Sequence, residues 1–129
     1  MIQYILLLIT TAMFLCGCND DHGDSLRLAR INHVVFFSLK SSEDTQELIH
    51  DCDSTLSSMG VVVSDWCGEH GDFGRPAVDD NYDVGLCVGF NSDEDYGRYV
   101  KHPDHLALVN KWKHRWNWIR MYDVVDETP

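Results

Sequence analysis

The sequence predicts an α+β fold of the ferredoxin-like type, with the element order β-α-β-β-α-β and a four-stranded antiparallel sheet carrying its helices on one face. Residues 31–39 alternate in the manner of a strand, and further strand patterns occur at 61–67, 82–90 and 118–125. Apolar residues recur at helical spacing over 48–59 and 103–116. A length of 129 residues with 44% hydrophobic and 24% charged residues indicates one globular domain.

The first strand and the helix after it are indicated by their periodicity and their end signals. The residues of 31–39 alternate in two rows that are both largely apolar, which predicts a strand with both faces buried. Ser41 supplies a helix N-cap, and apolar residues then follow at helical spacing up to Met59. Gly60 is the expected stop of this helix.

The strand at 82–90 has one bulky face and one nearly bare face. Val84, Leu86 and their alternate neighbours form the bulky row, whereas Gly85, Cys87 and Gly89 lie on the other side. Glycine inside a strand usually marks the close approach of another element. We therefore expect large helix side chains against the bare face, with the candidates Tyr96, Trp112 and Trp116.

The segment after this strand predicts two helices separated by a break. Ser92 and Asp95 resemble a capping box that opens a short helix through Val100. A residue before proline disfavours the helical conformation, whereas proline suits the first helical position. The chain is thus expected to break at His102 and to restart as a helix at Pro103.

One face of such a sheet is left without helices, and it must carry either the row of His33 or the row of Val34. An apolar sheet face of that size marks an interface or a ligand groove. We expect a homodimer through this open face, enclosing a central cavity for a small apolar or aromatic ligand. The residues expected to bind this ligand are His33, Val35, Phe37, Val84 and Leu86.

The first residues predict a targeting signal rather than part of the fold. Residues 5–15 form an uncharged apolar run that is too short to cross a bilayer as a helix, and Leu15-Cys16-Gly17-Cys18 follows. This arrangement resembles a bacterial lipoprotein signal, with residues 1–17 removed and Cys18 lipidated. Residues 18–29 then form an acidic tether to a domain at 30–126. The expected location is the bacterial cell envelope, bound to the membrane through the lipid and facing the periplasm; an uncleaved anchor or a buried N-terminal helix is the alternative.

Charge and cysteine content exclude several classes of function. Acidic residues outnumber basic residues 21 to 10, and the net charge of −11 excludes nucleic acid as a partner. The pattern Cys-x-x-Cys is missing, and neither a metal site nor a cofactor is expected. Cys52 and Cys87 fall in apolar positions typical of small buried side chains, with a Cys52–Cys67 bridge as the alternative for one pair.

Four segments together resemble the stress-responsive A/B barrel (Dabb) family. They are residues 33–37, 88–92, 122–123 and, most specifically, 99–105, which read Tyr-Val-Lys-His-Pro-Asp-His. The resemblance implies a dimeric α+β barrel. It also implies, from plant polyketide cyclases of this family, that Tyr99 and His105 are candidate catalytic residues and that His33 faces the cavity.

Three functions therefore stand side by side. The first is a lipid-anchored homodimer that binds a small apolar ligand, and the second is a cofactor-independent enzyme, an aldol-type cyclase or a monooxygenase, using Tyr99 and His105. The third is a structural envelope stress protein with a filled barrel, in which His105 only stabilises the helix start. A pocket that holds His33, Tyr99 and His105 together favours chemistry, an apolar pocket without them favours binding, and a filled interior favours structure.

Overall fold

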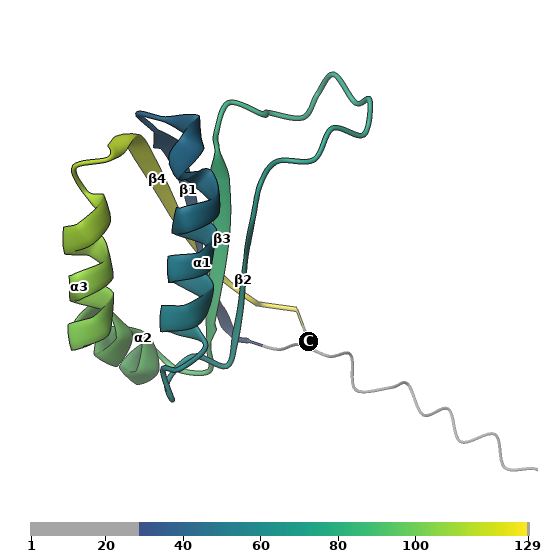
Figure 1. Ribbon diagram of the computed structural model, residues 1–129. Helices are drawn as coiled ribbons and strands as arrows, with labels where there is room; N and C mark the ends of the chain where they lie inside the picture. The colour runs from purple at the N-terminus through teal and green to yellow at the C-terminus, as the bar shows by residue number, and fades with distance from the viewer. Residues whose placement is uncertain (1–28, 129) are drawn as a thin grey trace, which may run out of the picture.

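Residues 29–128 are described by a computed structural model, in which four strands form one sheet and three α-helices lie beside it (Figure 1). The strand order is β2-β3-β1-β4, and every neighbouring pair is antiparallel. This confirms the predicted ferredoxin-like fold. In chain order the elements are β1 (Ile31–Leu39), the short 3-10 helix η1 (Ser42–Asp44), α1 (Thr45–Leu56), β2 (Ser64–Gly68), β3 (Val84–Phe90), α2 (Asp93–Val100), α3 (Pro103–Trp112) and β4 (Trp116–Val125).

The predicted signal peptide, the lipidation site Cys18 and nearly all of the tether lie outside the described residues. Within 29–128, the helices are all too short or too polar to serve as a membrane span.

The register of the sheet decides which row of each strand faces the helices. Val35 lies opposite Leu86 on β3 and opposite Met121 on β4. Directly opposed residues share a face, and the row of Val35 is the buried row of β1. Figure 1 shows all three helices on the same side of the sheet. The row that contains His33, Val35 and Phe37 therefore faces the helices, and the row of Val34 lies on the open face.

The bare row of β3 lies on the open face as well, so the expectation that Tyr96, Trp112 and Trp116 pack against it is wrong. A Cβ atom at Gly85 would lie 3.4 Å from the ring of Phe36 and 3.5 Å from the ring of Tyr82. The close approach predicted by the glycine is thus real, but the neighbour is a side chain of the sheet itself. The helices instead cover the bulky row, because burying four large apolar side chains stabilises the fold more than covering glycines.

Several element boundaries also differ from the prediction. Helix α3 ends at Trp112, and β4 begins at Trp116, because the turn between them is held by a bond from Arg115 N to Trp112 O and by one from Lys40 N to Arg115 O. The second bond extends the pairing of β1 with β4, and Trp116 then lies opposite Leu39. The segment 61–63 forms turns, and strand β2 begins only at Ser64.

The core lies between the sheet and the helices. It is centred on α1, on the inward row of β3 and on Trp112 of α3, and its fully buried side chains are Leu48, Cys52, Leu56, Val84, Val88, Phe90 and Trp112. Helix α1 packs on β2 and β3, and α3 packs on α1. Helix α1 thus lies directly on the β2–β3 half of the sheet, and α3 is held in place by its packing on α1.

The open face of the sheet is apolar and is not covered by the helices of its own chain (Figure 1). Trp66, Tyr122 and Val124 on this face are 57%, 52% and 52% exposed, and Val34 and Phe36 lie between them on β1. This confirms the predicted bare sheet face. The long connection between β2 and β3 projects on the same side, away from the helices.

Candidate functional site

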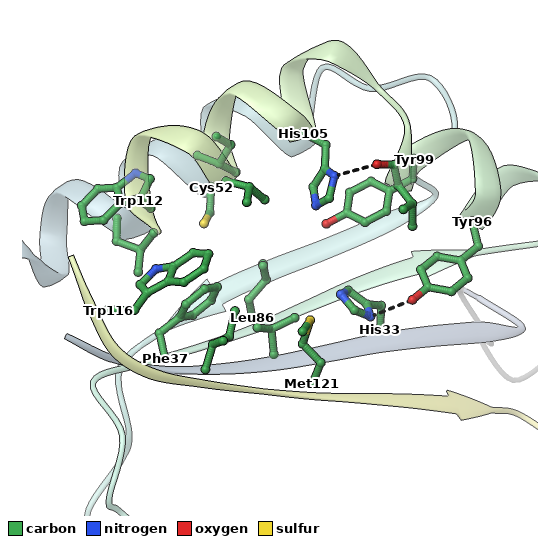
Figure 2. Close-up of a pocket in the computed structure, with 16 residues that line it drawn as sticks. His33, Phe37, Cys52, Leu86, Tyr96, Tyr99, His105, Trp112, Trp116 and Met121 are labelled. Atoms are coloured by element: carbon green, nitrogen blue, oxygen red, sulfur yellow. Dashed lines mark hydrogen bonds between the residues drawn. The ribbon is translucent and has the colours of Figure 1, made fainter. Parts of the chain in front are cut away.

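A cavity of about 330 Å³ lies between the inward face of the sheet and the helices. Its floor comes from β1, β3 and β4, and its roof comes from α1, α2 and α3 (Figure 2). Four of the five predicted ligand-binding residues line it: His33, Val35, Phe37 and Leu86. Val84 is fully buried in the core and is not part of the wall.

The place of this cavity corrects the expectation that the row of His33 lines a chamber between two sheets. Because the row of His33 faces its own helices, the pocket belongs to a single protomer. The two rows of β1 therefore lie in different surroundings. The odd-numbered row lines the pocket, and the even-numbered row provides the uncovered face.

The pocket wall is almost entirely apolar. None of the sixteen lining residues is an aspartate, glutamate, lysine or arginine. Within 29–128, histidine, cysteine and acidic side chains do not gather in groups of three that could hold a metal ion. A neutral molecule with few polar groups is the ligand that such a wall accommodates at the lowest desolvation cost.

The start of α3 positions the first candidate catalytic group. Pro103 occupies the first helical position, and the His102 side chain caps the helix by accepting a hydrogen bond from the Asp104 N–H. This confirms the predicted break at His102. His105, the third residue of the helix, consequently turns toward α2, where its ring centroid lies 4.3 Å from that of Tyr99. Both side chains face the pocket (Figure 2).

The hydrogen bonding of His105 fixes which of its nitrogen atoms can act as a base. Nδ1 lies 3.3 Å from the carbonyl oxygen of Val100, and a carbonyl only accepts, so Nδ1 must carry the hydrogen and donate it. In the neutral ring, Nε2 then has a free lone pair, and Figure 2 shows this nitrogen directed into the pocket. Burial lowers the pKa of His105 below its usual value, although the bond to Val100 acts in the opposite direction. His105 therefore presents a neutral imidazole at neutral pH.

Tyr99 supplies a hydroxyl group beside this base. The residue is 3% exposed, and burial raises the pKa of its hydroxyl well above the usual value. Its hydroxyl therefore stays protonated and can donate a hydrogen bond to a ligand oxygen. The predicted pair of Tyr99 and His105 is thus brought together in one pocket with His33.

Asp123 and Tyr96 form a second set of polar side chains, which the sequence analysis did not identify, and they bind His33 through hydrogen bonds. Its Nδ1 lies 2.6 Å from Asp123 Oδ1, and the Tyr96 hydroxyl lies 3.0 Å from Asp123 Oδ2 and 3.3 Å from His33 Nδ1. Because a carboxylate only accepts, His33 Nδ1–H and the Tyr96 hydroxyl both donate to Asp123. The second nitrogen of His33, Nε2, faces the pocket (Figure 2). Burial, followed by the bond to Asp123, raises the pKa of Tyr96 to about 12, so Tyr96 also stays protonated.

Two sequence signals could have indicated this group. Tyr96 precedes Tyr99 by one helical turn, so both fall on the same face of α2. Asp123 shares the inward row of β4 with Met121 and is the acidic residue in a row that is otherwise apolar. A carboxylate on an inward strand position indicates a polar partner, here His33, which lies opposite it in the register.

The chain matches the family model described as the stress responsive A/B barrel domain (Dabb) over residues 31–126. It therefore belongs to the Dabb family, as the segment 99–105 suggested. Among curated proteins, no match was found.

Solved structures show the same fold. A Dabb family protein with a ferredoxin-like fold from Mesorhizobium loti is 26% identical, and the similarity covers 76% of this chain and 97% of that chain with a TM-score of 0.64. A dimeric ferredoxin-like protein of unknown function from Thermobifida fusca is 16% identical, with 74% and 90% coverage and a TM-score of 0.62. A hydroxynitrile lyase from Passiflora edulis is 20% identical, with 79% and 98% coverage and a TM-score of 0.64.

Proposed function

We propose that this protein binds a small, neutral, largely apolar molecule, one per protomer, in the pocket between its sheet and helices. The observation that carries the proposal is a pocket wall without permanent charge, in which four polar side chains gather at one end: His33, Tyr96, Tyr99 and His105. Its volume of about 330 Å³ lies within the range of roughly 300–1,000 Å³ typical of ligand pockets. An aromatic molecule with one or two oxygen atoms fits this combination.

The open sheet face is the surface through which two copies are proposed to pair. Its exposed aromatic and aliphatic side chains, Trp66, Tyr122 and Val124 among them, would be removed from water by a second copy. The pocket faces the opposite way, so each protomer would keep its own.

Attachment to a bacterial membrane through lipid on Cys18 belongs to the same proposal and rests on the sequence of residues 1–18. It is tested by Cys18→Ala, which is expected to move the protein from the membrane fraction to the soluble fraction of the cell envelope. Unchanged fractionation would refute lipidation at this residue.

Binding is tested with N-phenyl-1-naphthylamine, a neutral aromatic dye whose fluorescence rises in apolar surroundings. Leu108 lines the pocket, whereas Leu106 lies on the same helix and is 48% exposed outside it. Leu108→Trp fills the pocket and is expected to weaken dye binding at least about tenfold. Leu106→Trp adds the same side chain elsewhere and should leave the affinity unchanged. Equal affinities in both variants and the wild type would place the dye elsewhere, and an inability to bind dye would favour a purely structural role.

A second function, proton transfer on the bound molecule, is favoured by one specific observation. The free Nε2 of His105 and the Tyr99 hydroxyl face the same part of the pocket (Figure 2). We propose that Nε2 removes a proton from a carbon next to a ligand carbonyl, and that the electron pair moves onto the carbonyl oxygen, which accepts a hydrogen bond from Tyr99. In an aldol-type closure the resulting carbon nucleophile attacks a second carbonyl of the same molecule. His105 then returns the proton to the new alkoxide, so no external reactant is consumed.

This chemistry is tested without knowledge of the natural substrate. Benzyl methyl ketone is a neutral aromatic ketone, and the exchange of its acidic C–H hydrogens for deuterium is followed by NMR. Wild-type protein should accelerate the exchange, and His105→Gln should slow it by about 100-fold or more. His114→Gln, at an exposed position after α3, is the matched control and should behave as wild type. Exchange no faster than in buffer, with the dye displaced by the ketone, would reject the proton transfer and leave the binding function intact.

A further inference from the structure

Two cysteines lie near each other across the boundary between the helix layer and the sheet. Cys52 is on α1 and is 1% exposed, and Cys67 is on β2, directly opposite Leu86 and thus on the helix side of the sheet. Helix α1 packs on β2, and Cys67 packs against the buried cluster that contains Cys52. Both are free thiols in this structure.

The third cysteine of the fold is placed differently. Cys87 points to the open face, where its register partner is Trp66 and its thiol lies 4.0 Å from Asn32 Oδ1. The sheet therefore separates Cys87 from the other two. Among residues 29–128, Cys52 and Cys67 are the two cysteines on the helix side of the sheet.

We propose that Cys52 and Cys67 form an intramolecular disulfide that links α1 covalently to the edge strand β2 when the chain meets a disulfide oxidant. The packing of α1 on β2 and the place of both side chains between helix and sheet support this modification, because a disulfide requires two cysteines that are close neighbours in the fold.

The environment of each thiol assigns its part in the reaction. The hydrogen bond from Cys52 to Cys67 raises the pKa of Cys52 and lowers that of Cys67, and burial raises the pKa of Cys52 further. Cys67 is also the more accessible of the two. The Cys67 thiolate therefore attacks one sulfur of the oxidant's disulfide and expels the other as a thiol. The Cys52 sulfur, as it loses its proton, then attacks Cys67 Sγ and expels the second oxidant thiol.

The bridge has consequences for stability and for the ligand site. It closes the chain segment 53–66 into a covalent loop, which restricts the unfolded chain and should raise the melting temperature by roughly 10 °C. Cys52 also lines the pocket, so the bridge replaces a thiol of the pocket wall by a disulfide sulfur. The redox state of this pair and the shape of the pocket are thereby coupled.

The test uses the full chain and oxidised glutathione as the oxidant. After oxidation the remaining thiols are alkylated, and the protein is cleaved before aspartate. This places Cys52, Cys67 and Cys87 on the separate peptides 51–52, 65–71 and 83–92, and Cys16 and Cys18 on a further peptide, 1–19. We expect the first two peptides to be linked with the loss of two hydrogen atoms and the peptide of Cys87 to be alkylated. The matched control Cys87→Ser should form the same link.

Two further results would overturn the proposal. One is alkylation of Cys52 and Cys67 as well as Cys87 after oxidation, and the other is glutathione that stays attached to Cys67. The melting temperature provides a separate readout that does not depend on peptide recovery. Oxidation should raise it in the wild type and in Cys87→Ser but not in Cys67→Ser, whose half-buried serine leaves the core in place. An equal rise in Cys67→Ser would also contradict the bridge.

Discussion

Replacing His105 by alanine tests whether this residue is a poised base or a structural support. The substitution removes one hydrogen bond, the 3.3 Å contact of Nδ1 with the Val100 carbonyl, and a half-buried ring that packs on Tyr99. A bond of this kind contributes about 1 kcal/mol, and we allow about the same for the ring contact. The free energy of unfolding should therefore fall by about 1–2 kcal/mol and the melting temperature by roughly 5–10 °C.

The pH dependence of this loss of stability distinguishes a neutral base from a structural support better than the size of the loss does. Burial lowers the pKa of His105 in the folded chain, so between that pKa and the unfolded value the unfolded chain binds the proton more readily. The wild type must therefore lose stability as the pH falls from the pKa of His105 in the unfolded chain to its lower pKa in the folded chain. Alanine has no such titration. The cost of His105→Ala should thus be smaller at about pH 5 than at about pH 7.5.

The assay is urea unfolding followed by tryptophan fluorescence at the two pH values and at one protein concentration, because the proposed dimer would make stability depend on concentration. His114→Ala, at an exposed position, is the control for removal of a histidine as such. If the cost of His105→Ala is equal at both pH values, or larger in acid, the pKa of His105 is not lowered and the reasoning that makes Nε2 a neutral base fails. A loss far above the range just given would indicate a structural role instead.

Three further predictions concern the proposed dimer, the hydrogen bonds of His33 and the buried Trp112. Phe36→Asp places a charge on the open sheet face and should shift sedimentation from dimer to monomer, whereas Leu106→Asp on the helix side should not. A dimer that withstands Phe36→Asp would contradict pairing through this face. Asp123→Ala leaves the donors of His33 and Tyr96 without their acceptor. The free energy of unfolding in urea should fall by only about 1 kcal/mol, because Asp123 is half exposed. An unchanged midpoint would show that water fully replaces the carboxylate. Trp112→Ala removes a fully buried ring whose Nε1 donates to Asp51 at 2.8 Å. The free energy of unfolding should fall by about 3–5 kcal/mol, and clearly less in Trp112→Phe. Similar losses in the two variants would contradict packing as the origin of the effect.

Local features of the sequence were sufficient to predict most of the fold. The alternation in 31–39 corresponds to β1 residue for residue, and the cap at Ser92 and the break at His102–Pro103 occur where the pattern places them. These features depend on the chemistry of adjacent residues, which the sequence shows directly. The pair of Tyr99 and His105 belongs to the same class, because six positions of continuous chain bring the two side chains together.

The features that the sequence did not reveal depend on contacts between distant segments. Both rows of β1 are apolar, so composition alone could not decide which row faces the helices, and the pocket was consequently expected between two sheets. Asp123 meets His33 across 90 positions of the chain, and only the register of β1 with β4 makes them partners. Cys52 and Cys67 likewise become neighbours only because α1 packs on β2.

The central claim is that each protomer holds a pocket into which His33 and His105 direct their Nε2 atoms, and histidine-ring NMR tests it most directly. Long-range ¹H–¹⁵N spectra distinguish the two nitrogen atoms of each ring. At neutral pH the account predicts that His105 is the neutral form with hydrogen on Nδ1, and that N-phenyl-1-naphthylamine shifts the Nε2 signals of His33 and His105 but not those of the exposed His50 and His114. Hydrogen on Nε2 of His105, or a dye that shifts only the exposed histidines, would contradict it.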